Sequence, residues 1–277
     1  MGSDLILCDG KNIFKSEYEI LKSIFGNYEF KIGSINGYVH SIEAECPINS
    51  LKSINELHLD TLKLSNTNIS DLSPLREMSL KSIEIINSKV TDISPLKEKY
   101  FDILRLDNNK IEDISCVYEI TANVLNLSHN PITDISGLID ATPDILILNG
   151  LDITDISPLK GVNFDTLYLD ETSVMDLSQI RGSKIRNLHL YNSQLEKLAY
   201  IRGIEELNID KTKVKDLSPL MGTHLKRLSA SNTLIEDLYP LRDMNLESLN
   251  IYGTPARDND DNKYILDRLR DKGCKII

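Results

Sequence analysis

The side chains that could bind a metal ion or act in catalysis are spread along this chain without the spacing such chemistry needs. None of the five histidines lies close to another histidine or to a pair of cysteines, the arrangement that zinc sites share. The four cysteines are also far apart, with no paired spacing. The histidines are His40, His58, His129, His189 and His224, and the cysteines are Cys8, Cys46, Cys116 and Cys274.

Acidic clusters give no better catalytic motif. The run DNDDN from Asp258 suggests calcium, but it lacks the glycine and the distal glutamate of an EF-hand loop. Adjacent acids such as Asp170-Glu171 fit a solvated loop or strand edge. No glycine-rich phosphate loop, nucleophile elbow or kinase signature is present. The sequence therefore predicts a protein that is not an enzyme, with no catalytic residues, no metal site and no cofactor.

The strongest pattern is a 21-residue repeat. The pentad D-[I/L]-S-P-L begins at Asp71 and recurs in full at Asp92, Asp155 and Asp216. One step, from Lys197 to Asp216, is two residues shorter than the others. Altered copies stand in the same frame at Asp113, Asp134, Asp176, Lys197 and Asp237. A repeat of this length indicates stacked supersecondary units that share one core.

Each repeat contains a short alternation of apolar residues that predicts one β-strand, with these residues inside and their neighbours outside. A polar residue at the ninth position of the unit is expected to bond backbone groups where the chain leaves the strand; Leu151 cannot do so. The apolar pairs are Leu62/Leu64, Ile83/Ile85, Leu104/Leu106, Leu125/Leu127, Leu146/Leu148, Leu167/Leu169, Leu188/Leu190, Leu207/Ile209, Leu228/Ala230 and Leu249/Ile251. In Ser-Pro-Leu, serine is expected to cap a short helical turn whose first residue is proline.

The full unit reads L-x-x-L-x-L-x-x-[N/T/S]-x-[I/V]-x-D-[I/L]-S-P-L, most clearly from Phe101 and Phe164. From Ile48 to the C-terminus the chain resembles leucine-rich-repeat proteins of the short-repeat kind, such as internalins and the leucine-rich regulator of protein phosphatase 1. The resemblance implies an α/β fold: a right-handed solenoid, or horseshoe, with a concave parallel sheet of about 10–11 strands. Because few residues separate the pentad from the next strand, the convex side is expected to hold 3₁₀ turns or irregular structure.

The ends of the chain depart from the repeat, as the ends of a solenoid must. We expect an N-terminal αβ cap over residues 1–47, leucine-rich repeats over 48–257 and a C-terminal helical cap over 258–277. The first cap would contain the helix KSEYEILKSIF, and the second the helix YILDRLRDKG followed by the edge segment CKII.

Composition limits the partners. A net charge of −11 and a pI of about 5.0 argue against nucleic acid, and no apolar run is long enough for membrane insertion. Small buried thiols in a reducing compartment are the favoured interpretation of the cysteines, which favours the cytoplasm; a Cys8–Cys46 disulfide is the alternative. The first residues do not form a signal peptide, but Met1-Gly2-Ser3 could replace a removed leader, so a secreted or cell-surface location stays open.

Side chains that the repeat leaves free on the strands suggest where a partner binds. An apolar and aromatic group occupies outward-facing strand positions at which the fold requires none. The acidic residues around it are Asp107, Asp170, Glu206 and Asp210. The apolar and aromatic group, called the apolar patch below, consists of Ile103, Val124, Ile145, Ile147, Tyr168, His189 and Tyr191. Simple β-propensity, or cover by the N-terminal segment or a second copy, would also account for it.

The sequence thus predicts a non-catalytic interaction scaffold that binds a protein or peptide on its concave face. An intracellular module, a secreted or cell-surface recognition domain like the internalins, and a self-associating structural module remain alternatives. A monomer is expected unless the patch mediates self-association.

Overall fold

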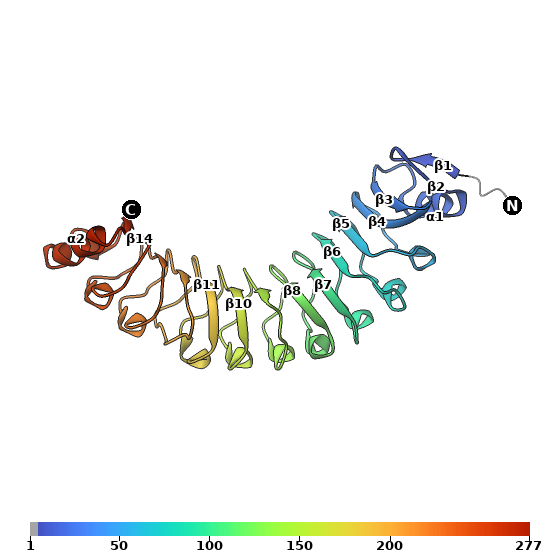
Figure 1. The fold of residues 1–277 in the computed structure, drawn as a ribbon. Coiled ribbons are helices and arrows are strands. Elements are labelled where there is room, and N and C mark those ends of the chain that lie inside the picture. The colour runs from blue at the N-terminus through green and yellow to red at the C-terminus, as the bar shows by residue number, and fades with distance from the viewer. Residues whose placement is uncertain (1–4) are drawn as a thin grey trace. The chain divides into compact units, whose positions relative to one another are not determined.

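The structure, a computed structural model, describes residues 5–277. Residues 1–4, on which the expectations about Met1-Gly2-Ser3 rest, lie outside the described residues. The chain divides after Pro131 into two compact units, coloured blue to green and green to red in Figure 1.

The first unit begins with an antiparallel hairpin and a helix, and continues into a sheet. Strands β3 and β4 are antiparallel, and every later pair, from β4–β5 to β7–β8, is parallel. The elements are β1 (Leu5–Cys8), β2 (Lys11–Phe14), α1 (Lys15–Phe25), β3 (Lys31–Ile35), β4 (Tyr38–Glu45), β5 (Thr61–Ser65), β6 (Ser82–Ile86), β7 (Tyr100–Arg105) and β8 (Thr121–Asn126).

The second unit holds a parallel sheet whose strands also follow one another in chain order. Its last strand, formed by the end of the chain, pairs with the strand before it. The elements are β9 (Ile145–Ile147), β10 (Asn163–Tyr168), β11 (Lys184–His189), β12 (Glu206–Asn208), β13 (Arg227–Ser229), β14 (Ser248–Asn250), α2 (Lys263–Asp271) and β15 (Lys275–Ile276).

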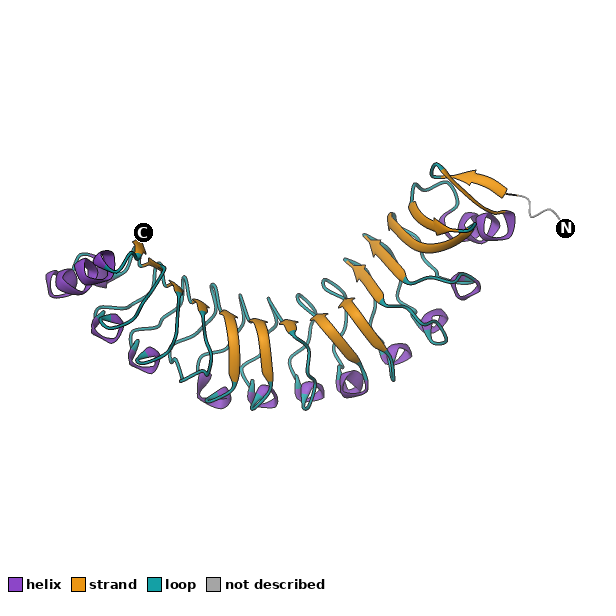
Figure 2. Cartoon of the chain, in the orientation of Figure 1, coloured by secondary structure: helices purple, strands orange, loops and turns teal. Residues whose placement is uncertain are grey.

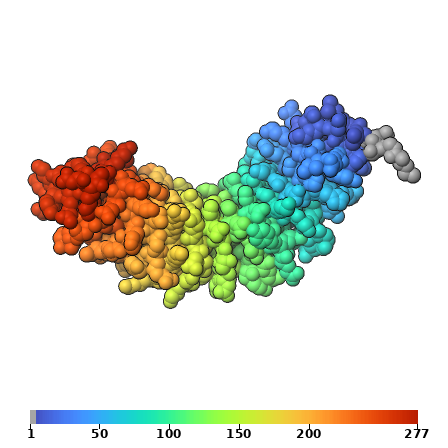
Figure 3. Space-filling model, in the orientation of Figure 1, coloured from blue at the N-terminus to red at the C-terminus, as the bar shows by residue number. Residues whose placement is uncertain are grey.

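Within each unit the strands line one side of the coils, and short 3₁₀ turns line the other, which we call the turn side (Figure 2). Within each unit of Figure 3 the colours follow one another in chain order. Each coil therefore packs on the coils that precede and follow it in the sequence. The paired leucines of the repeat point inward: Leu62, Leu104, Leu167 and Leu188 are fully buried. The predicted fold class is therefore confirmed.

The strand count exceeds the expected number for a simple reason. Strands β3 to β15 number thirteen in the described residues, of which ten, β5 to β14, are the strands of the L-x-L pairs. The others come from the ends of the chain: β3 and β4 precede the repeats, and β15 follows them. Only the L-x-L alternation could be counted from the repeat, so the terminal strands were undercounted.

Polar residues at the ninth position of the unit form the expected hydrogen bonds with the backbone, and Asn109 and Thr172 do so in different ways. Asn109 donates to the carbonyls of Ile85 and Leu106, at 2.7 and 3.0 Å, and accepts from the N–H of Val90 at 3.1 Å. It therefore joins its own coil to the preceding one. Thr172 only donates to the carbonyl of Leu169, three residues earlier, at 2.7 Å. Leu151 is buried at the same position, where its side chain can make no such bond.

The turns follow the pentads, but their capping residue differs from the expectation. Serine is the first residue of the 3₁₀ turn, as in Ser73–Leu75, and its side chain caps no backbone group. The aspartate two residues earlier does so: Asp71 Oδ1 accepts from Ser73 N–H at 2.8 Å. The prediction of serine as the cap was wrong because the serine hydroxyl donates to Asp71 Oδ2 at 2.9 Å, while the N–H of Leu75 bonds to the carbonyl of Leu72 at 2.9 Å.

The short repeat between Lys197 and Asp216 loses its two residues on the turn side. The stretch between the 3₁₀ turns Leu177–Ile180 and Ser218–Leu220 contains no helix, but isolated bridges join Asp176 to Lys197 and Lys184 to Arg202. The sheet register is kept, since Leu188 pairs with Leu207. The two missing residues are therefore absorbed before the strand begins.

One α-helix stands on each side of the repeat strands, α1 before them and α2 after them. At the C-terminal end, the buried Asn262 accepts from the N–H of Leu238 at 2.9 Å and donates to the carbonyls of Glu236 and Ala256. The DNDDN run therefore serves to attach α2 to the last full coil. All four cysteines are buried and free, so the alternative of a Cys8–Cys46 disulfide is wrong.

Candidate protein interface

The side chains between the buried strand residues form the solvent-facing side of the sheet, which we call the sheet face. In the first unit this face carries two members of the apolar patch. Ile103 on β7 and Val124 on β8 are direct neighbours in the parallel register, and both are partly exposed. The sequence correctly predicted that these two side chains lie side by side.

The second unit brings the aromatic members together. Ile147, Tyr168 and His189 occupy matching positions on β9, β10 and β11. The rings of Tyr168 and His189 stack, with centroids 4.5 Å apart and planes inclined by 16°. Ile145 pairs with Thr166 and lies two residues before Ile147, on the same face of β9. All four patch residues are partly exposed, as an interface that is open to a partner requires.

Tyr191 lies two residues beyond His189 and is tied to neighbouring polar groups. Its N–H donates to Asp170 Oδ1 at 2.7 Å, and its hydroxyl accepts a hydrogen bond from Lys211 Nζ. Burial raises the pKa of Asp170, although the Tyr191 N–H and the nearby His189 act in the opposite direction. Burial also raises the pKa of Tyr168, with Asp170 and Glu206 contributing to the rise. This part of the sheet face is therefore partly desolvated.

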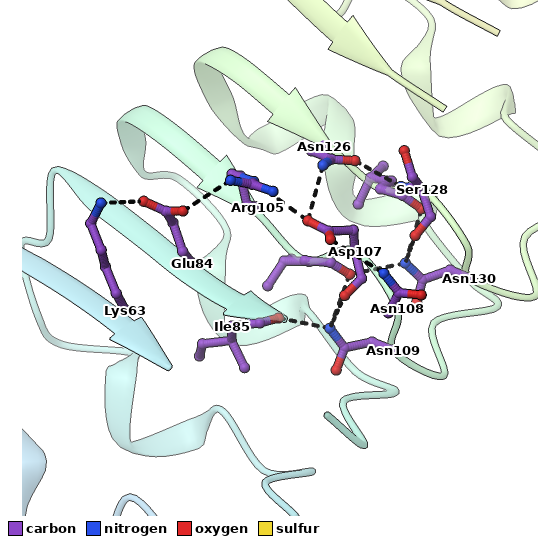
Figure 4. Close-up of polar contacts among 12 residues, drawn as sticks. Lys63, Glu84, Ile85, Arg105, Asp107, Asn108, Asn109, Asn126, Ser128 and Asn130 are labelled. Carbon is purple, nitrogen blue, oxygen red and sulfur yellow. Dashed lines mark hydrogen bonds and ion pairs between the residues drawn. The ribbon is translucent and has the colours of Figure 1, made fainter. Parts of the chain in front are cut away.

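The sheet face of the first unit carries a row of alternating charges that sequence reasoning did not single out. This charge row consists of Lys31, Glu43, Lys63, Glu84 and Arg105, at matching positions on β3 to β7. Figure 4 shows its last three members, with Glu84 between Lys63 at 2.7 Å and Arg105 at 3.2 Å. The recurrence of opposite charges one repeat apart in Lys63, Glu84 and Arg105 was the signal available in the sequence.

The charge row ends in a buried hydrogen-bond network (Figure 4). Arg105 Nε lies 3.5 Å from Asp107 Oδ1, and the same oxygen accepts from Asn126 Nδ2 at 2.9 Å. Asn126 Oδ1 in turn accepts from the N–H of Ser128 at 3.0 Å. Asp107, which the sequence placed only at the border of the patch, is 8% exposed and holds these strands' ends together.

A pocket of about 890 Å³ opens at the N-terminal end of this sheet face. We call it the cap pocket. One side is formed by the last residues of β4, β5 and β6, and the other by the segment 28–31, by Cys8 at the end of β1 and by Asp9 after it. No signal in the repeat indicates it, because it forms where the N-terminal segment meets the first coils.

Over residues 5–277, no group of three or more His, Cys, Asp or Glu side chains is arranged to hold a metal ion. In the same part of the chain, no helix combines the length and the apolar character needed to cross a bilayer.

Comparison with known proteins concerns the fold. No model of a protein family matches this chain, and no curated protein does. Among solved structures, an internalin (InlF) of Listeria monocytogenes is 19% identical, with 97% of this chain and 85% of that chain covered and a TM-score of 0.61. Internalin C2 of the same organism is 18% identical, with 86% and 89% covered and a TM-score of 0.43.

A leucine-rich-repeat protein of Leptospira interrogans is 16% identical, with 83% of this chain and 81% of that chain covered and a TM-score of 0.35. At such identities, similarity between structures is similarity of fold. With its repeated coils, parallel strands and 3₁₀ turns, this chain has the leucine-rich-repeat fold that is seen in InlF.

Proposed function

We propose that this protein is a non-catalytic interaction scaffold that binds a protein or peptide on its sheet face through the apolar patch. The observation that carries the proposal is the stacked pair of Tyr168 and His189 beside Ile147 on three adjacent strands. The repeat assigns its leucines to the core, so nothing in the fold requires aromatic and branched residues on the outer face. Half-buried tyrosines contribute strongly to binding energy in protein interfaces.

The surroundings of the patch also suit a protein partner. Asp170, Glu206 and Asp210 lie on the same face of the second unit, so an apolar centre has a charged border. Interfaces between proteins commonly have an apolar core and a polar rim. The acidic border and the net charge of −11 favour a partner with a neutral or basic surface.

The test is binding by a variant that lacks the aromatic contacts. Peptides would be selected on the wild type from a displayed library, and their affinities measured for Tyr168→Ala/Tyr191→Ala. We expect a loss of at least about tenfold, since truncating a central aromatic residue commonly costs about 2 kcal/mol or more. The matched control is Tyr118→Ala/Tyr264→Ala, which removes two tyrosines that are 66% and 69% exposed and lie off the sheet face. Equal affinity of the wild type and the patch variant would assign binding to another surface.

We also propose that residues 1–47 and 258–277 act as caps that shield the apolar ends of the repeats. The helix α1 buries Leu21 and Phe25, and α2 buries Ile265, Leu266 and Leu269. Terminal units of a solenoid need such cover because their outer coils have no further neighbour. Deleting residues 258–277 should produce a protein that aggregates at concentrations where the full chain stays dispersed, measured by light scattering; unchanged scattering would remove the cap assignment.

A further inference from the structure

The cap pocket carries more carboxylates than cations. Its charged lining residues are Asp9, Glu29, Glu43, Glu45 and Glu84, with Lys31 and Lys63 as the cations. Both lysines already have partners in the charge row. Lys31 lies 3.3 Å from Glu43, and Lys63 lies 2.7 Å from Glu84. The remaining acids therefore set the charge that a ligand would meet.

Two of those remaining acids, Asp9 and Glu45, accept hydrogen bonds, and none of the three has a cation as partner in the described part of the chain. Asp9 accepts from the N–H of Ile32 at 3.0 Å, and Glu45 accepts from the Asn66 side chain. Within residues 5–277, neither Asp9, Glu29 nor Glu45 forms an ion pair. These carboxylates converge on one concave space, so their potentials add and are focused there.

Apolar side chains complete the pocket. Tyr28 is 48% exposed, and Phe30 and Ile86 are partly exposed. Phe30 is held in place by the buried Phe25, whose ring centroid is 4.9 Å away. A ring face next to carboxylates attracts a cation that has an apolar stem, because the stem packs on the ring and the charge meets the acids.

We propose that the cap pocket is a second binding site, separate from the apolar patch, which takes an extended peptide segment through an arginine or lysine side chain. The stem of that side chain packs on Tyr28, Phe30 and Ile86, and its cationic head meets Glu29 and Glu45. The volume of about 890 Å³ lies within the range of roughly 300–1,000 Å³ in which pockets enclose ligands, so it admits more than one residue of a peptide.

Other cations and anions fit the pocket less well. In the described residues the carboxylates are not grouped closely enough to hold a metal ion, so the charge is best supplied by an organic cation that also fills the apolar wall. Nucleic acid and anionic lipid surfaces carry the same sign as the lining and are repelled. Arginine fits better than lysine because its planar guanidinium can bond two oxygens and stack on an aromatic ring.

The experiment uses a short probe peptide and its isosteric neutral analogue. Acetyl-Gly-Leu-Arg-Leu-Gly-amide and the same peptide with citrulline in place of arginine would be titrated into the 277-residue protein, with NMR as the readout. We expect the arginine peptide to bind at least about tenfold more tightly, equivalent to about 1.4 kcal/mol. The preference should fall as salt is raised, because the attraction is electrostatic.

Variants locate the site. Glu29→Gln/Glu45→Gln should abolish the preference for arginine over citrulline, whereas Glu19→Gln/Glu77→Gln, which removes two exposed acids elsewhere in the first unit, should keep it. All exchanges are at exposed positions and leave the core unchanged. Equal binding of the two peptides by the wild type, no binding of either, or an unchanged preference in Glu29→Gln/Glu45→Gln would each overturn the proposal. Tyr168→Ala/Tyr191→Ala should bind the arginine peptide as tightly as the wild type does. The proposal for the apolar patch and the proposal for the cap pocket can therefore fail independently of each other.

Discussion

At the scale of single residues, the ninth position of the repeat links coils to different extents. Asn109 and Asn130 each donate to carbonyls of two coils and accept a backbone N–H from one, whereas threonine at Thr172, Thr212 and Thr233 bonds a single carbonyl of its own coil. An asparagine side chain has both a donor and an acceptor group with enough reach for this. At these asparagines the first unit therefore has side-chain ties between coils that the threonines of the second unit lack.

The two kinds of residue should differ in their effect on stability. We expect Asn109→Ala to lower the free energy of unfolding by about 2 kcal/mol or more, because the carbonyl of Ile85 and the N–H of Val90 lose their side-chain partner, at roughly 1–3 kcal/mol for each buried group. The carbonyl of Leu106 keeps its hydrogen bond from Asn130. Thr172→Ala leaves only the carbonyl of Leu169 unpaired and should cost about 1 kcal/mol. Urea denaturation of both variants is the measurement. Equal losses would show that the additional bonds of Asn109 contribute nothing.

Asp170 should make the second unit less stable at neutral pH. Burial raises its folded-state pKa above the unfolded value, so the folded state holds the proton more tightly and stability falls as pH rises through that pKa. Asp170→Asn keeps the oxygen that accepts the Tyr191 N–H but removes the charge. We expect the variant to be more stable than the wild type at pH 7, with the difference vanishing as pH falls to about 4, near the unfolded pKa.

Thermal denaturation across this pH range measures the effect, with Asp140→Asn, an exchange at an exposed acid, as the control. A stability difference that is independent of pH would contradict the assigned cause.

Much of the residue-level structure could be predicted, because a regular period fixes which positions point inward. The neighbours Ile103 and Val124, and the row of Ile147, Tyr168 and His189, follow from that period alone. The ring stack of Tyr168 and His189 depends on side-chain rotamers, which no spacing gives. Asp107 was assigned only to the border of the patch because its burial depends on Arg105 and Asn126. That these residues bind a partner remains a prediction.

At the scale of elements, each turn depends on the aspartate of its pentad. The hydrogen bond from the Ser73 N–H, together with that from its hydroxyl, lowers the pKa of Asp71. The same backbone bond from serine lowers the pKa of Asp113 and of Asp155. These carboxylates therefore stabilise the fold when ionised, and this contribution is lost as pH falls through their lowered folded-state pKa values.

Removing one such cap should weaken the protein measurably. We expect Asp71→Ala to lower the free energy of unfolding by about 1 kcal/mol, the usual effect of losing a capping side chain. Asp71→Asn should lose much less, because its amide oxygen still accepts the Ser73 N–H. Urea denaturation at pH 7 compares the three proteins. If both variants behaved alike, the carboxylate charge and not the turn geometry would be the stabilising factor.

The elements were predictable where the repeat is regular and less so where it is not. The ten L-x-L strands and the 3₁₀ turns follow from the pattern, since apolar alternation and Ser-Pro are both local signals. The cap pocket needs two segments that are distant in sequence, Glu29 and Glu45 among them, to meet around one space. The pocket arises only in the tertiary structure, and the period of the repeat gives no information about it.

At the scale of the whole molecule, the question is whether the sheet face is free or covered by a second copy. A net charge of −11 opposes close approach of two copies, so we expect a monomer. Sedimentation velocity of the wild type and of Ile145→Glu should then give the same monomeric value. A wild type that sediments as a dimer, together with a monomeric Ile145→Glu variant, would instead support self-association through the patch.

The short repeat that precedes Asp216 has a consequence for engineering. The partners of its two bridges, Asp176 to Lys197 and Lys184 to Arg202, are separated by different numbers of residues. Leu188 nevertheless pairs with Leu207 in the sheet. The residues between Lys197 and Arg202 are thus where the shorter chain is accommodated, and the register of the strands is kept. Exposed Tyr200, in that interval, marks the position where a fluorescent reporter or affinity tag could be inserted while both proposed binding surfaces stay intact.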